Sequence, residues 1–291
     1  MDLERFDQLR ATISTSAGEI AYVDAGEGPP AVFVHGVFTS SYLWRHVITE
    51  LADERRCIAL DLPCHGRTRI KPDHSLALPD QAEVLTLFCD SLDLDAIDLV
   101  ANDTGGAIAQ VFAVDHPDRL RTLVLTNCDV HDELPPKAFM PTVEAASKGQ
   151  LAPTIMRMAK DPGAIRSALG RCYEHAELLP DEVVLEYFAP FSTPEGAREL
   201  ERAMTSLKAA DLVAIEPQLA RLNVPTLIVW GTADIFFDVS LAHRLKDEIQ
   251  GADRVIEIPG AKLFFPDERG AELARCLREH WTTHIPRRDD E

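Results

Sequence analysis

Residues 98–107 read D-L-V-A-N-D-T-G-G-A and place Asp103 between an apolar run and a helical pattern. The run Ile97–Asn102 predicts a buried strand, and Thr104–His116 predicts a helix. A sharp turn from strand to helix holds one side chain above the sheet, and it needs small neighbours because the backbone passes close on both sides. The small neighbours in this chain are Ala101, Gly105 and Gly106. We therefore expect the Asp103 carboxylate above the sheet; the alternative is that Asp103 only caps the helix.

Predicted strands and helices alternate on both sides of this stretch. The further strands are expected at Leu9–Ser14, Glu19–Asp24, Ala31–Val34, Cys57–Leu60, Leu120–Thr126, Thr226–Trp230 and Arg254–Ile258. The further helices are expected at Ser41–Ala52, Pro79–Leu92, Val239–Ile249 and Pro266–Trp281. Repeated βα units predict an α/β fold, with a mostly parallel, doubly wound sheet and its ligand site beyond the carboxyl ends of the strands. The polar residues at or just after those ends are His35, Asp61, Asp103, Asp129 and Asp234.

The strand pattern disappears between about residues 129 and 211. Prolines at 162, 180, 190 and 194 break this stretch into short segments with helical spacing, which predicts a helical insertion. We expect core residues 1–128, the insertion at 129–211, the rest of the core at 212–284, and a tail at 285–291.

Composition narrows the classes of partner. The chain has 291 residues and a formal net charge of −19, so its surface repels nucleic acid and anionic membranes. Its 6 cysteines lack paired metal-ligand spacing, and we expect free thiols. The acidic N-terminus has no apolar leader, and no run is long enough to span a membrane. These features predict a cytoplasmic protein that binds a small molecule and neither nucleic acid nor membrane; they leave its oligomeric state open.

Several motifs occur in an order that resembles the α/β-hydrolase fold superfamily. They are A-V-F-V-H-G at 31–36, D-L-P-C-H-G-R-T at 61–68, the segment around Asp103, and V-P-T-L-I-V-W-G-T-A-D at 224–234. The aspartate, together with S-S-Y-L-W-R at 40–45, is similar to the epoxide hydrolase and haloalkane dehalogenase branches. This resemblance implies that Asp103 is a nucleophile that forms an alkyl ester, and that Asp234 is the acid that orients a histidine. It also implies backbone N–H groups of Val37 and Thr104 at the developing negative charge, a helical cap, and neither cofactor nor metal.

The chain departs from this pattern at the histidine. The superfamily places it in a segment of the form P-G-x-x-H-F, but residues 259–266 read P-G-A-K-L-F-F-P, so Leu263 takes its place. Neighbouring Lys262 replaces it as a base only if burial lowers its pKa. His243, His280 and His284 lie too far along the chain for a simple register shift.

Two other departures bear on the substrate. Haloalkane dehalogenases hold the leaving halide with Trp or Asn side chains, but the corresponding residues are Val37 and Thr104. Epoxide hydrolases activate the ring oxygen with cap tyrosines, and Tyr173 and Tyr187 lie in the right segment. The other residues expected at the pocket are His35, Phe38, Trp44 and Leu263.

We interpret the sequence as a hydrolase that uses Asp103 on a small to medium apolar substrate, closer to epoxide hydrolases than to dehalogenases. Two alternatives stay open. In one, Asp103 is a general acid or base in an isomerase, lyase or cyclase, which needs no water-activating histidine. In the other, the chain is a non-catalytic ligand-binding protein on the same scaffold.

Overall fold

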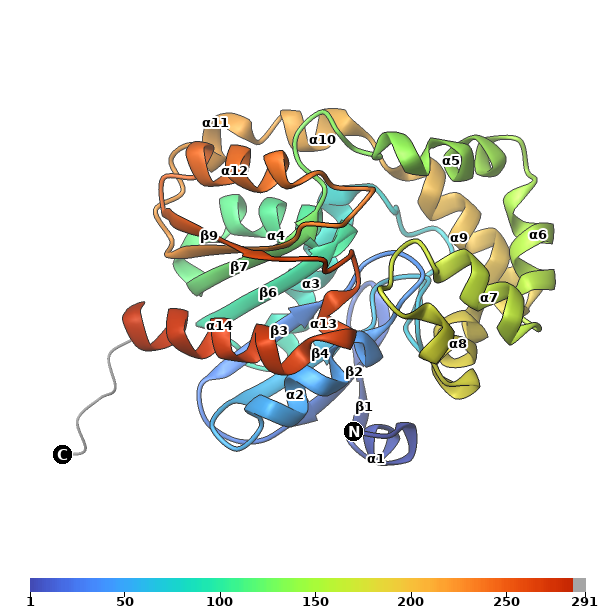
Figure 1. Cartoon of the computed structure of the whole chain (residues 1–291), viewed down its shortest axis with the longest axis horizontal. Coiled ribbons are helices and arrows are strands. Elements are labelled where there is room, and N and C mark those ends of the chain that lie inside the picture. Colours follow the sequence, from blue (N-terminus) through green and yellow to red (C-terminus); the bar gives the residue numbers. More distant parts are fainter. Residues whose placement is uncertain (285–291) are drawn as a thin grey trace.

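A computed structural model describes residues 1–284. Its strands form one sheet in the order β1-β2-β4-β3-β6-β7-β8-β9, with the short β5 paired to β2 (Figure 1). The neighbouring strands in the part β4-β3-β6-β7-β8-β9 of this order are parallel to one another. β2 runs antiparallel to its three partners β1, β4 and β5. The strands are β1 (Arg10–Ser14), β2 (Gly18–Ala25), β3 (Pro30–Val34), β4 (Arg56–Leu60), β5 (Arg69–Ile70), β6 (Ile97–Asp103), β7 (Leu120–Cys128), β8 (Thr226–Gly231) and β9 (Ala252–Ile258). This confirms the predicted α/β fold with a mostly parallel sheet.

The centre of the sheet is the most deeply buried part of the fold. Every residue of β6 is buried, because β3 and β7 flank it and helices cover both faces. A strand buried on both faces is expected to carry a continuous apolar run, as Leu99–Ala101 does. The following helix α4 (Thr104–Asp115) is also buried around most of its circumference. The Asp103 turn is therefore held between two rigid elements.

Helices cover the two faces of the sheet. On one side α2 (Arg45–Leu51) packs against α14 (Gly270–His284), and on the other α3 (Leu78–Ser91) packs against α4, while α12 (Val239–Glu248) packs on β8 and β9 (Figure 1). The remaining short elements of the core are α1 (Leu3–Gln8), the 3₁₀ turns η1 (Ser41–Trp44) and η2 (Pro117–Arg119), and α13 (Phe265–Glu268).

The chain between β7 and β8 forms helices and no strand. Figure 1 shows α5 to α9 gathered at one end of the sheet, on the right of the view. The elements are η3 (Lys137–Phe139), α5 (Met140–Ser147), α6 (Leu151–Met158), α7 (Pro162–Leu169), η4 (Ala176–Leu178), α8 (Asp181–Phe188), η5 (Ala189–Ser192), α9 (Pro194–Ser206), α10 (Ala209–Val213) and α11 (Glu216–Leu219). A boundary at residue 211 falls inside α10, so the division into core and insertion stays a prediction at that end.

The structure adds details that the sequence pattern did not give. α1 and β5 were not predicted, since six residues and two residues are too short for a periodic signal. The last predicted helix is two helices, because the chain turns at Arg269 between α13 and α14.

All six cysteines are buried and free. Within residues 1–284 no helix combines the length and apolarity needed to cross a membrane. The predicted tail, 285–291, lies outside the described residues.

Candidate active site

Asp103 occupies a strained backbone position at the end of β6. Its φ of 56° and ψ of −135° are rare for a residue with a side chain, and such strain persists only where the surroundings enforce it. Close backbone approach is the enforcing feature. A Cβ added at Gly36 would lie 2.3 Å from the Cβ of Asp103, and one added at Gly105 would lie 2.2 Å from the carbonyl oxygen of His35. Glycine is therefore required at both positions.

The Asp103 carboxylate is buried but held by the backbone. The N–H of Val37 donates a hydrogen bond of 2.8 Å to Oδ2. Burial raises the pKa of Asp103 to about 7, and the charge of Asp234 adds to this rise, while the N–H groups of Val37 and Thr104 oppose it. The two amides predicted to face a developing negative charge thus face the carboxylate of Asp103 itself.

A second buried carboxyl group belongs to Asp129, one residue beyond β7. Its side chain is 1% exposed, and neither oxygen has a hydrogen-bond partner among the described residues. Burial raises the pKa of Asp129 well above its usual range, and the charge of Asp103 raises it further. Both causes disfavour the charged form of this carboxyl group. The sequence placed Asp129 at a strand end, but gave no signal that its carboxyl group would have no partner.

Asp103 and Asp129 line one small cavity of about 40 Å³. Apart from these two carboxyl groups and Thr104, its lining is apolar or contributed by cysteine and proline. Of the residues predicted at the pocket, Phe38 and Leu263 line it. The lining residues are Val37, Phe38, Asp103, Thr104, Asp129, Leu134, Pro135, Pro136, Phe139, Cys172, Leu207, Phe236, Phe237, Leu263 and Phe264. No histidine, and no other side chain with a nitrogen, lines this cavity within residues 1–284.

Asp234 lies behind this cavity and is held in place by two donors. Its Oδ1 accepts a hydrogen bond of 2.8 Å from the N–H of Phe236, and its Oδ2 accepts one of 2.8 Å from Asn127 Nδ2. Burial raises the pKa of Asp234 to about 6 despite these donors. Since Phe236 lines the cavity and the charge of Asp234 acts on Asp103, the fold brings Asp234, Asp103 and Leu263 to one region.

Two predicted pocket residues support the site from outside the cavity lining. His35 is fully buried: its Nδ1–H faces the carbonyl oxygen of Gly36 at 2.7 Å, and its Nε2 accepts a hydrogen bond of 2.9 Å from the N–H of Leu62. Burial lowers the pKa of His35 to about 3, so the ring is neutral and fixes the loop that carries Val37. Trp44 is also fully buried, and its ring packs against Phe33 at 5.3 Å.

The structure places the two predicted cap tyrosines away from the cavity. The hydroxyl groups of Tyr173 and Tyr187 donate hydrogen bonds of 3.0 and 3.1 Å to Oδ2 of Asp267. The other carboxylate oxygen of Asp267 pairs with Arg45 at 2.6 Å, and all four side chains are buried. Neither tyrosine lines the cavity, and both hydroxyl groups are directed to this ion pair instead.

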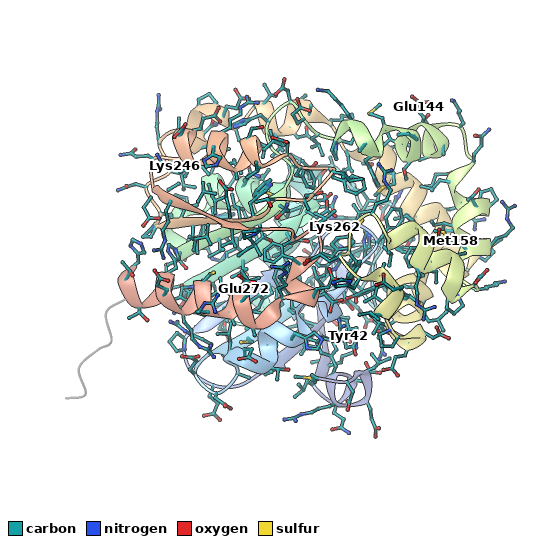
Figure 2. The ribbon with its side chains drawn as sticks, in the orientation of Figure 1. Tyr42, Glu144, Met158, Lys246, Lys262 and Glu272 are labelled. Carbon is teal, nitrogen blue, oxygen red and sulfur yellow. The ribbon has the colours of Figure 1, made fainter. Side chains whose placement is uncertain are left out.

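Lys262, the neighbour of Leu263 that replaces the histidine as a base only if burial lowers its pKa, is also engaged elsewhere. Its Nζ donates hydrogen bonds to the carbonyl oxygens of Tyr173, at 2.7 Å, and Gly170, at 3.3 Å. Figure 2 labels Lys262, which belongs to the segment before α13 and reaches the insertion through these two contacts. These contacts join the two parts of the chain, and Lys262 does not line the cavity.

A strained turn from strand to helix, backbone donors and a buried cavity at the carboxyl ends of parallel strands are features of the α/β hydrolase fold. The α/β hydrolase fold family matches residues 29–268, which is most of the chain. The chain belongs to this family.

Known relatives include enzymes with different reactions. The chain is 29% identical to haloalkane dehalogenase 2 of Mycobacterium bovis, over 92% of this chain and 93% of that protein. It is 27% identical to the cis-3-alkyl-4-alkyloxetan-2-one decarboxylase of Shewanella oneidensis, over 79% of this chain and 74% of that protein. The solved structure of the epoxide hydrolase CorEH has a TM-score of 0.80 and 20% identity, covering 94% of this chain and 98% of that one. This structural likeness concerns the fold alone.

Proposed function

We propose that the chain is a hydrolase in which Asp103 attacks an sp³ carbon of a small apolar epoxide. The observation that carries this proposal is that Asp103 and Asp129, a carboxyl group whose pKa is raised by burial, line the same apolar cavity. The Val37 N–H binds Oδ2 of Asp103, which leaves Oδ1 as the attacking atom. A carboxylate that attacks sp³ carbon forms an alkyl ester.

The lining favours an epoxide over an alkyl halide. A leaving halide needs hydrogen-bond donors, and within the described residues no nitrogen-bearing side chain lines the cavity. The ring oxygen of an epoxide instead needs a proton, which a carboxylic acid can supply. Asp129 is buried, and its raised pKa favours the protonated form that can supply this proton.

The reaction then needs two carboxyl groups and no histidine. Oδ1 of Asp103 bonds to one epoxide carbon while that carbon's bond to oxygen breaks, and the ring oxygen takes the proton of Asp129. In the second step Asp129, now a carboxylate, takes a proton from water, and the resulting hydroxide attacks Cγ of Asp103. The ester bond to Cγ breaks, its leaving oxygen is protonated by Asp129, and a diol is released. The proton that the hydroxide leaves on the Asp103 carboxyl group then passes to Asp129, which restores the starting state of both groups. A carboxyl group that acts first as acid and then as base also operates in retaining glycosidases.

Electrostatics favour this order of events. The charge of Asp103 is one cause of the raised pKa of Asp129. Esterification removes that charge, so the carboxylate form of Asp129 becomes easier to reach as the first step proceeds. A cavity of about 40 Å³ has room for one or two waters and little more, so a substrate enters only when the surrounding helices move.

A second function, acid–base chemistry without hydrolysis, is favoured by the decarboxylase relative and by the absence of histidine from the described lining. In that case Asp103 transfers a proton and forms no ester.

Turnover of a short-chain 1,2-epoxyalkane in H₂¹⁸O distinguishes hydrolysis through an ester at Asp103 from acid–base chemistry without hydrolysis. Hydrolysis of an ester at Cγ transfers one oxygen from water to Asp103, so mass spectrometry of the Asp103 peptide is expected to show ¹⁸O after several turnovers. Diol formation with an unlabelled Asp103 contradicts the nucleophile, and reversible binding without turnover supports the ligand-binding alternative.

Asp129→Asn tests the second carboxyl group. We expect this variant to lose roughly two to four orders of magnitude in rate, as for removal of a general acid or base. Asp132→Asn is a matched control, since Asp132 lies on the surface and pairs with Arg244. Equal activity of the two variants contradicts the role of Asp129.

A further inference from the structure

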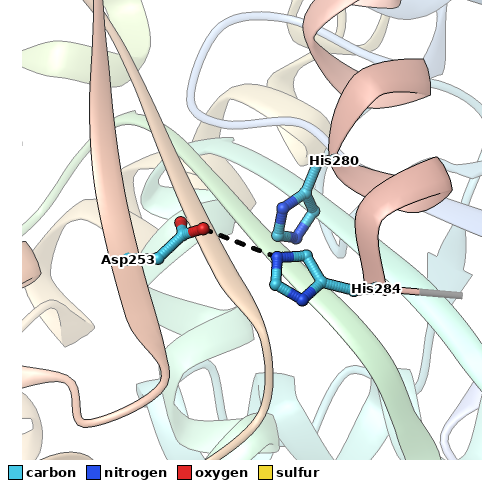
Figure 3. A group of neighbouring side chains, drawn as sticks. All are labelled: Asp253, His280 and His284. Carbon is cyan, nitrogen blue, oxygen red and sulfur yellow. Dashed lines mark ion pairs between the residues drawn. The ribbon is translucent and has the colours of Figure 1, made fainter.

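Three potential metal ligands meet far from the cavity, between β9 and α14. They are Asp253 on β9 and His280 and His284 on α14 (Figure 3). One ligand atom from each lies within 4.8 Å of the others. His284 Nε2 is 3.5 Å from Oδ2 of Asp253, and the two imidazole rings are 4.7 Å apart between centroids. Because residues four apart share one face of a helix, α14 presents both rings to the start of β9.

His280 is the feature that ordinary packing does not explain. Its side chain is fully buried, yet neither ring nitrogen has a hydrogen-bond partner within the described residues. A buried polar group without a partner costs stability unless something else satisfies it.

The surroundings fit a cation. Asp253 supplies a negative charge, and its carboxylate is partly exposed, which leaves a path from solvent. The nearby positive charge of Arg254 is paired with Glu279 at 2.8 Å.

We propose that Asp253, His280 and His284 bind a divalent transition-metal ion such as Zn²⁺. Two imidazoles and one carboxylate are a common ligand set for this ion, with water in the remaining position. Tetrahedral bonds of about 2.0–2.1 Å place ligand atoms roughly 3.4 Å apart. The His284–Asp253 separation already meets this value, and small ring rotations bring His280 to it. Since Asp253 lies at the start of β9, opposite the strand ends that carry Asp103, the ion would join α14 to the sheet rather than take part in the reaction.

The test is a titration of the full chain, purified without a histidine tag and treated with chelator, with Co²⁺ and Zn²⁺. We expect one equivalent of Co²⁺ to give the visible absorption of a low-symmetry site, Zn²⁺ to displace it, and Zn²⁺ to raise the melting temperature. His284→Ala and Asp253→Asn are expected to weaken binding at least tenfold, since even residues behind the ligands contribute about that much.

His243→Ala is the matched control, because His243 is an exposed histidine that pairs with Glu257 at 2.9 Å, near the other end of β9. It is expected to bind like the unmodified chain. Binding that is absent, or that survives both ligand substitutions, overturns the proposal. Both substituted side chains are partly exposed, so the variants are expected to fold, and circular dichroism verifies this before titration.

Discussion

The backbone N–H of Val37 donates a 2.8 Å hydrogen bond to Oδ2 of Asp103, and this bond joins the loop after β3 to the end of β6. The loop position is set by His35, whose neutral ring binds both Gly36 and Leu62. The same N–H is placed to stabilise negative charge on Oδ2 when hydroxide attacks an ester at Cγ, because the oxygen that it binds is the one that becomes the oxyanion. In the proposed reaction, one contact therefore both orients Asp103 for attack and assists the hydrolysis of its ester.

This contact predicts that the backbone of Val37 matters more than its side chain. Val37→Pro removes the N–H and is expected to lower kcat for epoxide hydrolysis by roughly 10²–10³, the usual effect of losing one such donor. Val37→Ala keeps the donor and is expected to retain most of the activity. Steady-state rates of both variants, with melting curves to verify folding, provide the measurement. Equal losses in the two variants would show that side-chain packing is the important factor.

The raised pKa of Asp103 predicts a stability that depends on pH. Burial raises this pKa from 3.8 to about 7, so the folded protein holds the proton more tightly than the unfolded chain does. The associated stability is present below the ordinary pKa and is lost as pH rises through neutrality. Asp103→Asn removes the buried charge and is expected to increase the free energy of unfolding at pH 8 by on the order of 2–4 kcal/mol.

Urea denaturation of both proteins at pH 5 and pH 8 tests this expectation. The advantage of the asparagine variant is expected to shrink at pH 5, where Asp103 is already protonated in the folded protein. An advantage of equal size at both values contradicts the buried charge as its cause.

The Arg45–Asp267 pair predicts a large loss of stability when one partner is removed. Asp267 binds Arg45, Tyr173 and Tyr187, and all are buried. Asp267→Asn leaves the charge of Arg45 without a counter-charge and is expected to cost about 3–5 kcal/mol. Tyr173→Phe removes one hydrogen bond to a charged group and is expected to cost about 1.5–3 kcal/mol. Denaturation curves measure both, with the surface variant Asp132→Asn expected to change little.

The core of the fold was predictable because its signals are local. An apolar run, a reactive side chain and two glycines within ten residues specify the strand, the turn and the helix around Asp103. The orientation of Tyr173 and Tyr187 was not predictable in this way. Tyr173 lies in the loop between α7 and η4 and Tyr187 lies on the short helix α8, and the direction of both side chains depends on the buried partner Asp267, about 80–94 residues further along the chain.

Dependence on three-dimensional packing also explains two features that the sequence analysis did not identify. Asp129 was recognised at a strand end, but its lack of a partner depends on the packing of several segments around it. Asp253 and the two histidines of α14 carry no spacing motif as a set, because a strand and a helix bring them together only in three dimensions.

The position of Leu263 leads to the last prediction. Leu263 lines the cavity with Asp103, its carbonyl oxygen accepts a 3.1 Å hydrogen bond from Asn102 Nδ2, and Asp234 lies in the same region. We expect that Leu263→His places an imidazole where Asp234 can fix its tautomer, so that it activates water against the ester at Asp103. The lifetime of the alkyl adduct, followed by mass spectrometry of the intact protein, is expected to fall by about 10², the lower end of the effect of a general base.

Two controls make this prediction specific. Leu263→Asn adds a polar group without a base and is expected to leave the adduct lifetime unchanged. Combining Leu263→His with Asp234→Asn removes the group that orients the imidazole, so most of the gain is expected to disappear. If the unmodified chain already releases the adduct as fast as the histidine variant, Asp129 or another group supplies the full base, and the absence of an imidazole does not limit the reaction.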